Sequence, residues 1–236
     1  MTSESPVKTT AGNRGKRRSG RALRLKESTA TIPKGTVVMV VDEFGDLGVT
    51  PKDPVRKRKY RHFGYAVTLT DRPGRFAGLT EINRKTREKE LKAYWDSPEG
   101  RMKIAEGMAD LNVDTRAYYV DKDDPPRGWC GKKGSSQNMG RLFRRSVKES
   151  MPEKGNVLVI VDSHSGHRNI ESFLEEQSGD GLKVRGGAYD SHSGPYSDLL
   201  QTQDYAAYAA RDAVEHRNRK LSDIIGIKFR RITGRI

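Results

Sequence analysis

The stretch Val37–Asp46, which reads VVMVVDEFGD, decides the fold that we expect for this chain. It follows Thr36 and opens with five apolar residues, four of them valine. Such a β-branched run predicts a central strand over Thr36–Val41. Asp42 comes directly after it, where a carboxylate is costly to keep charged unless a cation meets it. Gly45 allows a tight turn, so the chain can fold back around whatever Asp42 binds.

Two further acids stand in comparable places. Asp162 follows the apolar strand expected over Asn156–Val161, and Asp204 stands at the expected start of an Ala-rich helix over Leu199–Glu215. Carboxylates that are distant in the chain but converge in the fold commonly bind Mg²⁺ or Mn²⁺, which prefer oxygen ligands. The three acids therefore indicate a metal-dependent hydrolytic site.

Each acid also has a structural explanation of its own. Asp42 is typical of a turn, Asp162 suits the N-cap of a helix starting near Arg168, and Asp204 suits the first turn of a helix because of the helix dipole. Strand alternation puts Asp42 and Glu43 on opposite faces, so we assign Asp42 as the ligand and Glu43 to a supporting position. A shared metal accounts for all three aspartates at once, whereas the separate explanations differ.

The remaining pattern alternates strands and helices. A strand over His62–Leu69 follows the first strand after a loop, which predicts an antiparallel pair. The other expected elements are a helix over 98–111, a strand over Thr115–Val120, a helix over Gln137–Ser150, a short helix over Arg168–Gln177 and an edge strand over Leu182–Tyr189. This order indicates an α/β fold with a mixed β-sheet flanked by helices, and the layout resembles the ribonuclease H-like architecture.

The positive charge lies mainly at the two ends of the chain. Of the formal net charge of +14, residues 1–34 carry +7 and residues 216–236 carry +6, which leaves +1 for the residues between them. We expect a disordered basic tail over 1–31, one domain over 32–215 and a basic extension over 216–236. Such basic ends suit a polyanion such as nucleic acid, although they also suit a purely solubilising role.

Composition narrows the class of protein further. The 236 residues suffice for one α/β domain, and no stretch approaches the roughly 20 apolar residues of a membrane span. The start has no apolar signal-peptide core, and the single cysteine, Cys130, excludes an internal disulfide, so we expect a cytoplasmic protein. His164 and His167 lack a third ligand at zinc-binding spacing, which favours surface or substrate-contacting histidines.

In order and context, several short motifs resemble the family known as domain of unknown function 3800, whose members are taken to be ribonuclease H-like. The similarity covers roughly residues 36–215. The matching segments are Asp42–Gly45, the strand Phe63–Leu69, Glu90–Lys92, Val120–Lys122, Asp162 and Gln201–Asp204. Phe44 stands where the family usually has Ser, and Gln203 where it usually has Ala.

The resemblance implies a two-metal hydrolytic centre. Its ligands to two Mg²⁺ or Mn²⁺ ions would be Asp42, Glu90, Asp162 and Asp204. In such a centre, ions about 4 Å apart activate water and stabilise the leaving oxygen. Lys92 would contact the scissile phosphate, with Glu43 and Gln201 in supporting positions. By composition alone, the charges around Glu90 and Lys92 also suit a solvated helix face.

We therefore expect a metal-dependent nuclease that hydrolyses phosphodiester bonds of DNA or RNA. The backbone of the nucleic acid would be held without sequence readout by the basic ends and by one basic loop, Arg56, Lys57, Arg58 and Lys59. Two alternatives stay open from sequence: a non-catalytic nucleic-acid-binding protein on the same scaffold, and a hydrolase or transferase of a small phosphorylated substrate.

Overall fold

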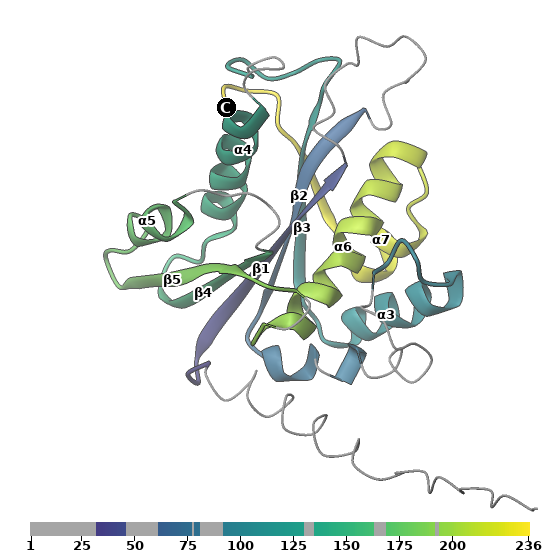
Figure 1. Ribbon diagram of the computed structural model, residues 1–236, viewed down its shortest axis with the longest axis horizontal. Helices are drawn as coiled ribbons and strands as arrows, with labels where there is room; N and C mark the ends of the chain where they lie inside the picture. Colours follow the sequence, from purple (N-terminus) through teal and green to yellow (C-terminus); the bar gives the residue numbers. More distant parts are fainter. Residues whose placement is uncertain are drawn as a thin grey trace, which may run out of the picture.

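A six-stranded mixed sheet forms the centre of the protein (Figure 1). The computed structural model describes residues 32–45, 61–76, 78–80, 92–129, 135–162, 169–191 and 194–236. Across the sheet the strands follow the order β5-β4-β1-β2-β3-β6. Their bounds are β1 Thr36–Gly45, β2 His62–Thr70, β3 Asp114–Asp121, β4 Gly155–Asp162, β5 Leu182–Tyr189 and β6 Lys228–Arg231.

The strand directions match the layout expected from sequence. β1, β2 and β3 pair antiparallel, while β4 joins the other side of β1 in parallel and β5 joins β4 in parallel. A central first strand between an antiparallel β2–β3 pair and a parallel β4–β5 pair is the ribonuclease H-like arrangement. The predicted fold class, an α/β mixed sheet flanked by helices, is confirmed.

Helices cover both faces of the sheet (Figure 1). One face carries α4 and α5, and the other carries α3, α6 and α7. The helical bounds are η1 Pro73–Arg75, α3 Pro98–Asp110, α4 Ser135–Ser150, α5 Ile170–Glu175, α6 Ser197–His216 and α7 Lys220–Ile225. No described helix has the length and apolar character to cross a membrane.

Successive side chains of β1 point to opposite faces of the sheet, so they contribute to the core on both faces. Met39 and Val41 pack with apolar residues of α4, while Val38 and Val40 pack against the start of α6. All four side chains are fully buried. These four residues of the opening stretch are therefore apolar because β1 lies at the centre of the sheet, with helices on both sides.

Phe44 has a packing role in the core. It lies opposite Gly64 in the β1–β2 register, and a Cβ at Gly64 would collide with the Phe44 ring. The ring is 4% exposed and belongs to the core beneath α6. Gly45 ends β1 with a positive φ of 83°, and a Cβ there would collide with the His62 carbonyl oxygen. Both glycines are thus required by the close approach of β1 and β2.

Two expectations about helix and strand ends need correction. Asp204 does not open its helix, because α6 begins at Ser197, about two turns earlier. The acid of its first turn is Asp198, whose Oδ1 accepts a hydrogen bond from Thr80 at 2.9 Å. Likewise Asp42 lies within β1, because pairing with β2 continues to Gly45.

The segment 216–236, which the sequence suggests is only a basic extension, contributes to the sheet. It contains α7 and β6, and β6 pairs in parallel with β3. Ile232, just after β6, is 1% exposed and donates its backbone N–H to the Tyr119 carbonyl at 2.8 Å. The expected tail 1–31 lies outside the described residues.

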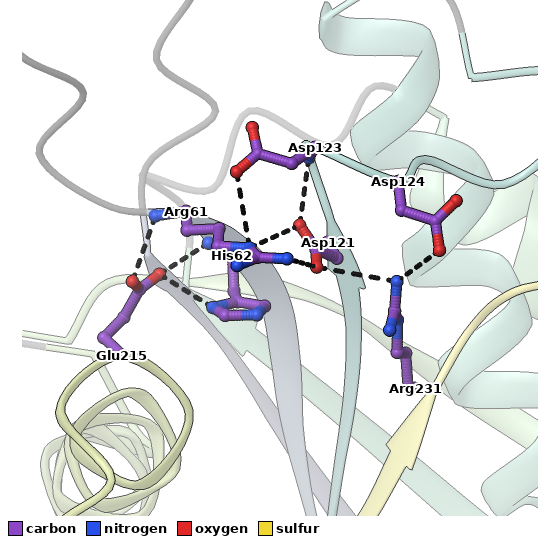
Figure 2. Close-up of polar contacts among 7 residues, drawn as sticks. All are labelled: Arg61, His62, Asp121, Asp123, Asp124, Glu215 and Arg231. Atoms are coloured by element: carbon purple, nitrogen blue, oxygen red, sulfur yellow. Dashed lines mark hydrogen bonds and ion pairs between the residues drawn. The ribbon is translucent and has the colours of Figure 1, made fainter.

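An ion network closes one end of the sheet and joins four elements (Figure 2). The Arg61 guanidinium donates to both carboxylate oxygens of Asp121, at the end of β3. Glu215, near the end of α6, accepts from the backbone N–H groups of Arg61 and His62. Arg231 of β6 pairs with Asp124 at 2.6 Å and with Asp121 at 3.5 Å.

Asp121 is the centre of this network. Its side chain is 3% exposed. The hydrogen bond from Arg61 lowers the pKa of Asp121 from 3.8 to about 2, although burial acts in the opposite direction. The carboxylate therefore stabilises the folded state at pH values above the unfolded pKa, and this contribution is lost as the pH falls from about 4 towards 2.

Asp121→Asn is expected to lower the free energy of unfolding at pH 7 by about 1–3 kcal/mol, because it replaces a buried carboxylate that accepts charge-assisted hydrogen bonds by a weaker, neutral acceptor. Urea unfolding measures this loss, and the difference from wild type should vanish near pH 2. Asp123→Asn is the matched control, since Asp123 is 50% exposed and lies 3.4 Å from Arg61. An equal loss in both variants at pH 7 would contradict a central role for Asp121.

Candidate active site

Asp42 and Asp162 lie side by side on neighbouring strands. The parallel register pairs Val41 with Val161, and the two aspartates are the next residues of β1 and β4. Residues in register on parallel strands point to the same face of the sheet. That face is the one under α6, because Val40 and Ile160, two residues earlier, pack against its Leu199 and Leu200.

Asp204 reaches the same place from α6. Its neighbour Gln203 is fully buried and donates its side-chain N–H to the Ala66 carbonyl at 2.8 Å. Ala66 is the partner of Asp42 in the β1–β2 register. The hydrogen bond fixes how α6 sits on the sheet, at the level of Asp42.

A fourth segment is held against Asp204. The backbone N–H of Ala93 donates to Asp204 Oδ2 at 2.6 Å, and Ala93 is fully buried. Lys92, which the sequence singles out through Glu90–Lys92, is therefore next to the acids. Every residue except proline has a backbone N–H, so the sequence could not predict that the N–H of Ala93 would bind Asp204.

The electrostatics of Asp42 show that these groups act on one another. The pKa of Asp42 is raised well above its ordinary value, first by burial and then by the charges of Asp204, Glu43 and Asp162. The Lys92 ammonium acts in the opposite direction. The structure thus brings together three predicted ligands and the predicted phosphate-contacting lysine.

Glu43 lies on the opposite face from Asp42, as alternation predicts. It is paired in register with Tyr65, which packs in the core beside α4. Burial, followed by the charges of Glu43 and Asp42, raises the pKa of the Tyr65 hydroxyl well above its usual value. Glu43 therefore adds negative potential to the site from behind the sheet.

Gln201 has a visible positioning contact. It is 4% exposed, and its side-chain N–H donates to the Ser191 carbonyl at 2.9 Å. This bond holds the first part of α6 against the segment that follows β5. Its assignment as a supporting residue of the site stays a prediction. Glu90 and the basic loop Arg56, Lys57, Arg58 and Lys59 lie outside the described residues, as do His164 and His167.

The donor set fits a hard divalent cation. It consists of carboxylate oxygens, which Mg²⁺ and Mn²⁺ prefer. Burial, followed by repulsion from the neighbouring acids, raises the pKa of Asp42, and a bound cation would offset both effects. In the described ranges, no three His, Cys, Asp or Glu side chains already lie close enough together to hold an ion. A cation would have to draw these carboxylates together or take a further ligand, and the sequence offers Glu90.

Comparison with known proteins adds little to this geometry. No family model matches the chain, and a search of curated proteins finds no match. A solved structure of the PCNA:RNase HII complex from Archaeoglobus fulgidus contains a similar chain. The TM-score is 0.47 and the sequence identity 16%, over 75% of this chain and 73% of that chain. The architecture assigned above rests on strand order and register, and membership of the family that the motifs resemble stays a prediction.

Asp42→Asn is expected to stabilise the metal-free protein at pH 7, by about 1–2 kcal/mol, because it removes a charge from a crowded acidic group. A raised carboxyl pKa means that the folded state binds more protons than the unfolded state between pH 3.8 and that pKa. The stability of the wild type should therefore fall as the pH rises through this window, and that of the variant should fall less.

Thermal unfolding in EDTA across pH 4–8 measures both effects. Asp110→Asn, a change at an exposed residue of α3, is the control for losing one carboxylate anywhere on the protein. Equal stability differences between Asp42→Asn and wild type at pH 4 and pH 8 would contradict the raised pKa of Asp42.

Proposed function

We propose that this protein is a metal-dependent nuclease that hydrolyses phosphodiester bonds of DNA or RNA. The observation that carries the proposal is the placement of Asp42, Asp162 and Asp204 on one face of the sheet, from β1, β4 and α6. Carboxylates from three separate elements, with a lysine beside them, suit phosphoryl chemistry better than a structural role. The structural alternative for Asp204, a favourable place in the first helical turn, does not apply because α6 starts at Ser197.

The described aspartates, with Glu90, would hold Mg²⁺ or Mn²⁺. Such ions, when bound, activate water and stabilise the charge that develops on a phosphoryl group. Lys92 would place its ammonium against the scissile phosphate, since its charge already acts on Asp42. The hydrogen bond from Ala93 to Asp204 holds the turn that carries Lys92 beside the acids. The hydrogen bond from Gln203 to Ala66 holds α6 at the level of the acids.

The charge distribution supports nucleic acid as the substrate. The acids lie in the nearly neutral body of the chain, and the surplus positive charge lies at its ends. At the C-terminal end, the side chains of Lys228 and Arg230 in β6 are 70% and 59% exposed, although each also pairs with a carboxylate, Asp114 at 2.8 Å and Glu149 at 3.0 Å. Lysine and arginine contacts to phosphates position a nucleic acid without reading its sequence. The motifs that resemble domain of unknown function 3800 support the same proposal.

One observation favours a second candidate, nucleic-acid binding without catalysis. Within the ranges that the structure describes, the carboxylates do not enclose a cation as they stand. This alternative gives salt-sensitive binding that is indifferent to divalent metal and to the three aspartates.

Cleavage of labelled single-stranded and duplex DNA, RNA and hybrid substrates, with Mg²⁺ or Mn²⁺, tests the proposal. We expect cleavage by the wild type, and a rate more than about a hundredfold lower in Asp42→Asn, Asp162→Asn and Asp204→Asn, because each removes a metal-binding oxygen charge. Asp110→Asn is the matched control and should retain wild-type activity. Absence of cleavage of every substrate with both metals would contradict the proposal, and so would full activity in the three variants.

Metal binding can be measured separately from activity. At a Mg²⁺ or Mn²⁺ concentration ten times the dissociation constant, a single site should raise the free energy of unfolding by about 1.4 kcal/mol. Differential scanning fluorimetry should show this rise for wild type and a smaller one for Asp42→Asn, which loses a ligand charge. An identical metal response in both proteins would place the binding elsewhere.

A further inference from the structure

Two aromatic side chains beside the acids are exposed to solvent. Tyr94 is 63% exposed and Trp95 is 62% exposed, and within the described ranges they are the large hydrophobic residues with this degree of exposure. They follow Ala93, whose backbone N–H is bonded to Asp204. The proposed nuclease site makes no use of either ring.

The turn that carries these rings is held in place on both sides. The N–H of Trp95 donates to the Lys92 carbonyl at 3.0 Å. The guanidinium of Arg101, from α3, donates to the carbonyls of Ala93 and Asp96, each at 3.0 Å.

Two more contacts anchor the far side of the turn. The Tyr205 hydroxyl of α6 donates to Asp96 Oδ2 at 2.9 Å, and Ser97 caps α3 by accepting from the Gly100 N–H at 3.0 Å. The backbone is thus fixed to α3 and α6 while the two aromatic rings face solvent. A fixed turn lowers the entropy lost when a ligand packs on those rings.

We propose that Tyr94 and Trp95 form a stacking platform for the bases of a single-stranded nucleic acid. The platform rests on the proposed function, because its place beside Lys92 and Asp204 would hold the strand at the acids. Every base has a flat π-face, so stacking on aromatic rings is tolerant of sequence and contributes about 1–3 kcal/mol per base. In a duplex the bases are already stacked on one another, which favours a single strand or an unpaired end.

The small size of the exposed apolar surface favours nucleic-acid bases over a protein partner as the ligand of the two rings. A stable protein interface buries about 800 Å² on each side and has an apolar centre. In the described residues, the two rings are followed by the polar residues Asp96, Ser97 and Glu99, and the exposed Pro98 among them adds only one small ring. Two adjacent rings suit one or two bases and are too few for such a centre.

Oligonucleotide binding by the full chain tests the proposal. Fluorescence anisotropy in EDTA, which prevents metal-dependent cleavage, would compare a labelled single-stranded oligonucleotide with an abasic deoxyribose-phosphate oligomer of equal length and charge. We expect the dissociation constant for the oligonucleotide to rise about five- to a hundredfold in Trp95→Ala and in Tyr94→Ala. Binding of the abasic oligomer should not change, and Trp95→Phe should retain most of the affinity.

A spectroscopic measurement reports on the ring directly. The chain has two tryptophans, so Trp129→Phe leaves Trp95 as the sole indole. The oligonucleotide should quench its fluorescence, whereas the abasic oligomer should not. Far-ultraviolet circular dichroism of each variant checks that the fold is retained.

Several outcomes would overturn the platform. The first is that the Tyr94→Ala, Trp95→Ala double variant binds the oligonucleotide with wild-type affinity. The second is that the double variant loses as much affinity for the abasic oligomer as for the oligonucleotide. The third is that the wild type does not bind the oligonucleotide. A change from oligomer to monomer in that variant, seen by light scattering, would assign the rings to a protein contact instead. If the double variant still cleaves and its affinity is unchanged, only the stacking platform is refuted. If binding depends on the two rings but no protein cleaves, only the proposed nuclease activity is refuted.

Discussion

The structure depends on one constraint: negative charges are held close together over the centre of an apolar sheet. The parallel register of β1 and β4 places Asp42 beside Asp162, and α6 adds Asp204 above them. This repulsion opposes folding, so the surrounding packing must overcome it. The buried residues 38–41 and 157–161, with helices on both faces, do so.

The position of α6 follows from contacts at three levels along its length. Gln201 bonds to the segment after β5, Gln203 to the centre of β2, and Glu215 to the start of β2. A helix fixed at three levels can neither slide nor rotate freely on the sheet. Adjustment to a bound cation or substrate must therefore come from side-chain rotation rather than from movement of α6.

Features set by periodicity could be read from the sequence, and features set by tertiary contacts could not. The β-branched run within Val37–Asp46 was sufficient to predict the central strand, and strand alternation was sufficient to predict the opposite faces of Asp42 and Glu43. The start of α6 was misplaced because Ser197 and Asp198 are polar, and the burial of Asp198 becomes evident only with its partner Thr80. Strand β6 was missed because Lys228–Arg231 contains one apolar residue, and its pairing depends on β3, more than a hundred residues earlier. The Asp121 network could not be predicted for the same reason, because its members come from four segments that are distant in the chain.

The place of β6 has a consequence for solubility. As the last strand of the sheet, it covers the edge of β3 and occupies backbone groups that an exposed edge would offer to other chains. Uncovered strand edges promote intermolecular pairing and aggregation, and natural edges are protected by charge, above all by lysine. β6 itself is short and basic, with Lys228 and Arg230 largely exposed. These exposed positive side chains therefore oppose growth of the sheet from one molecule to the next.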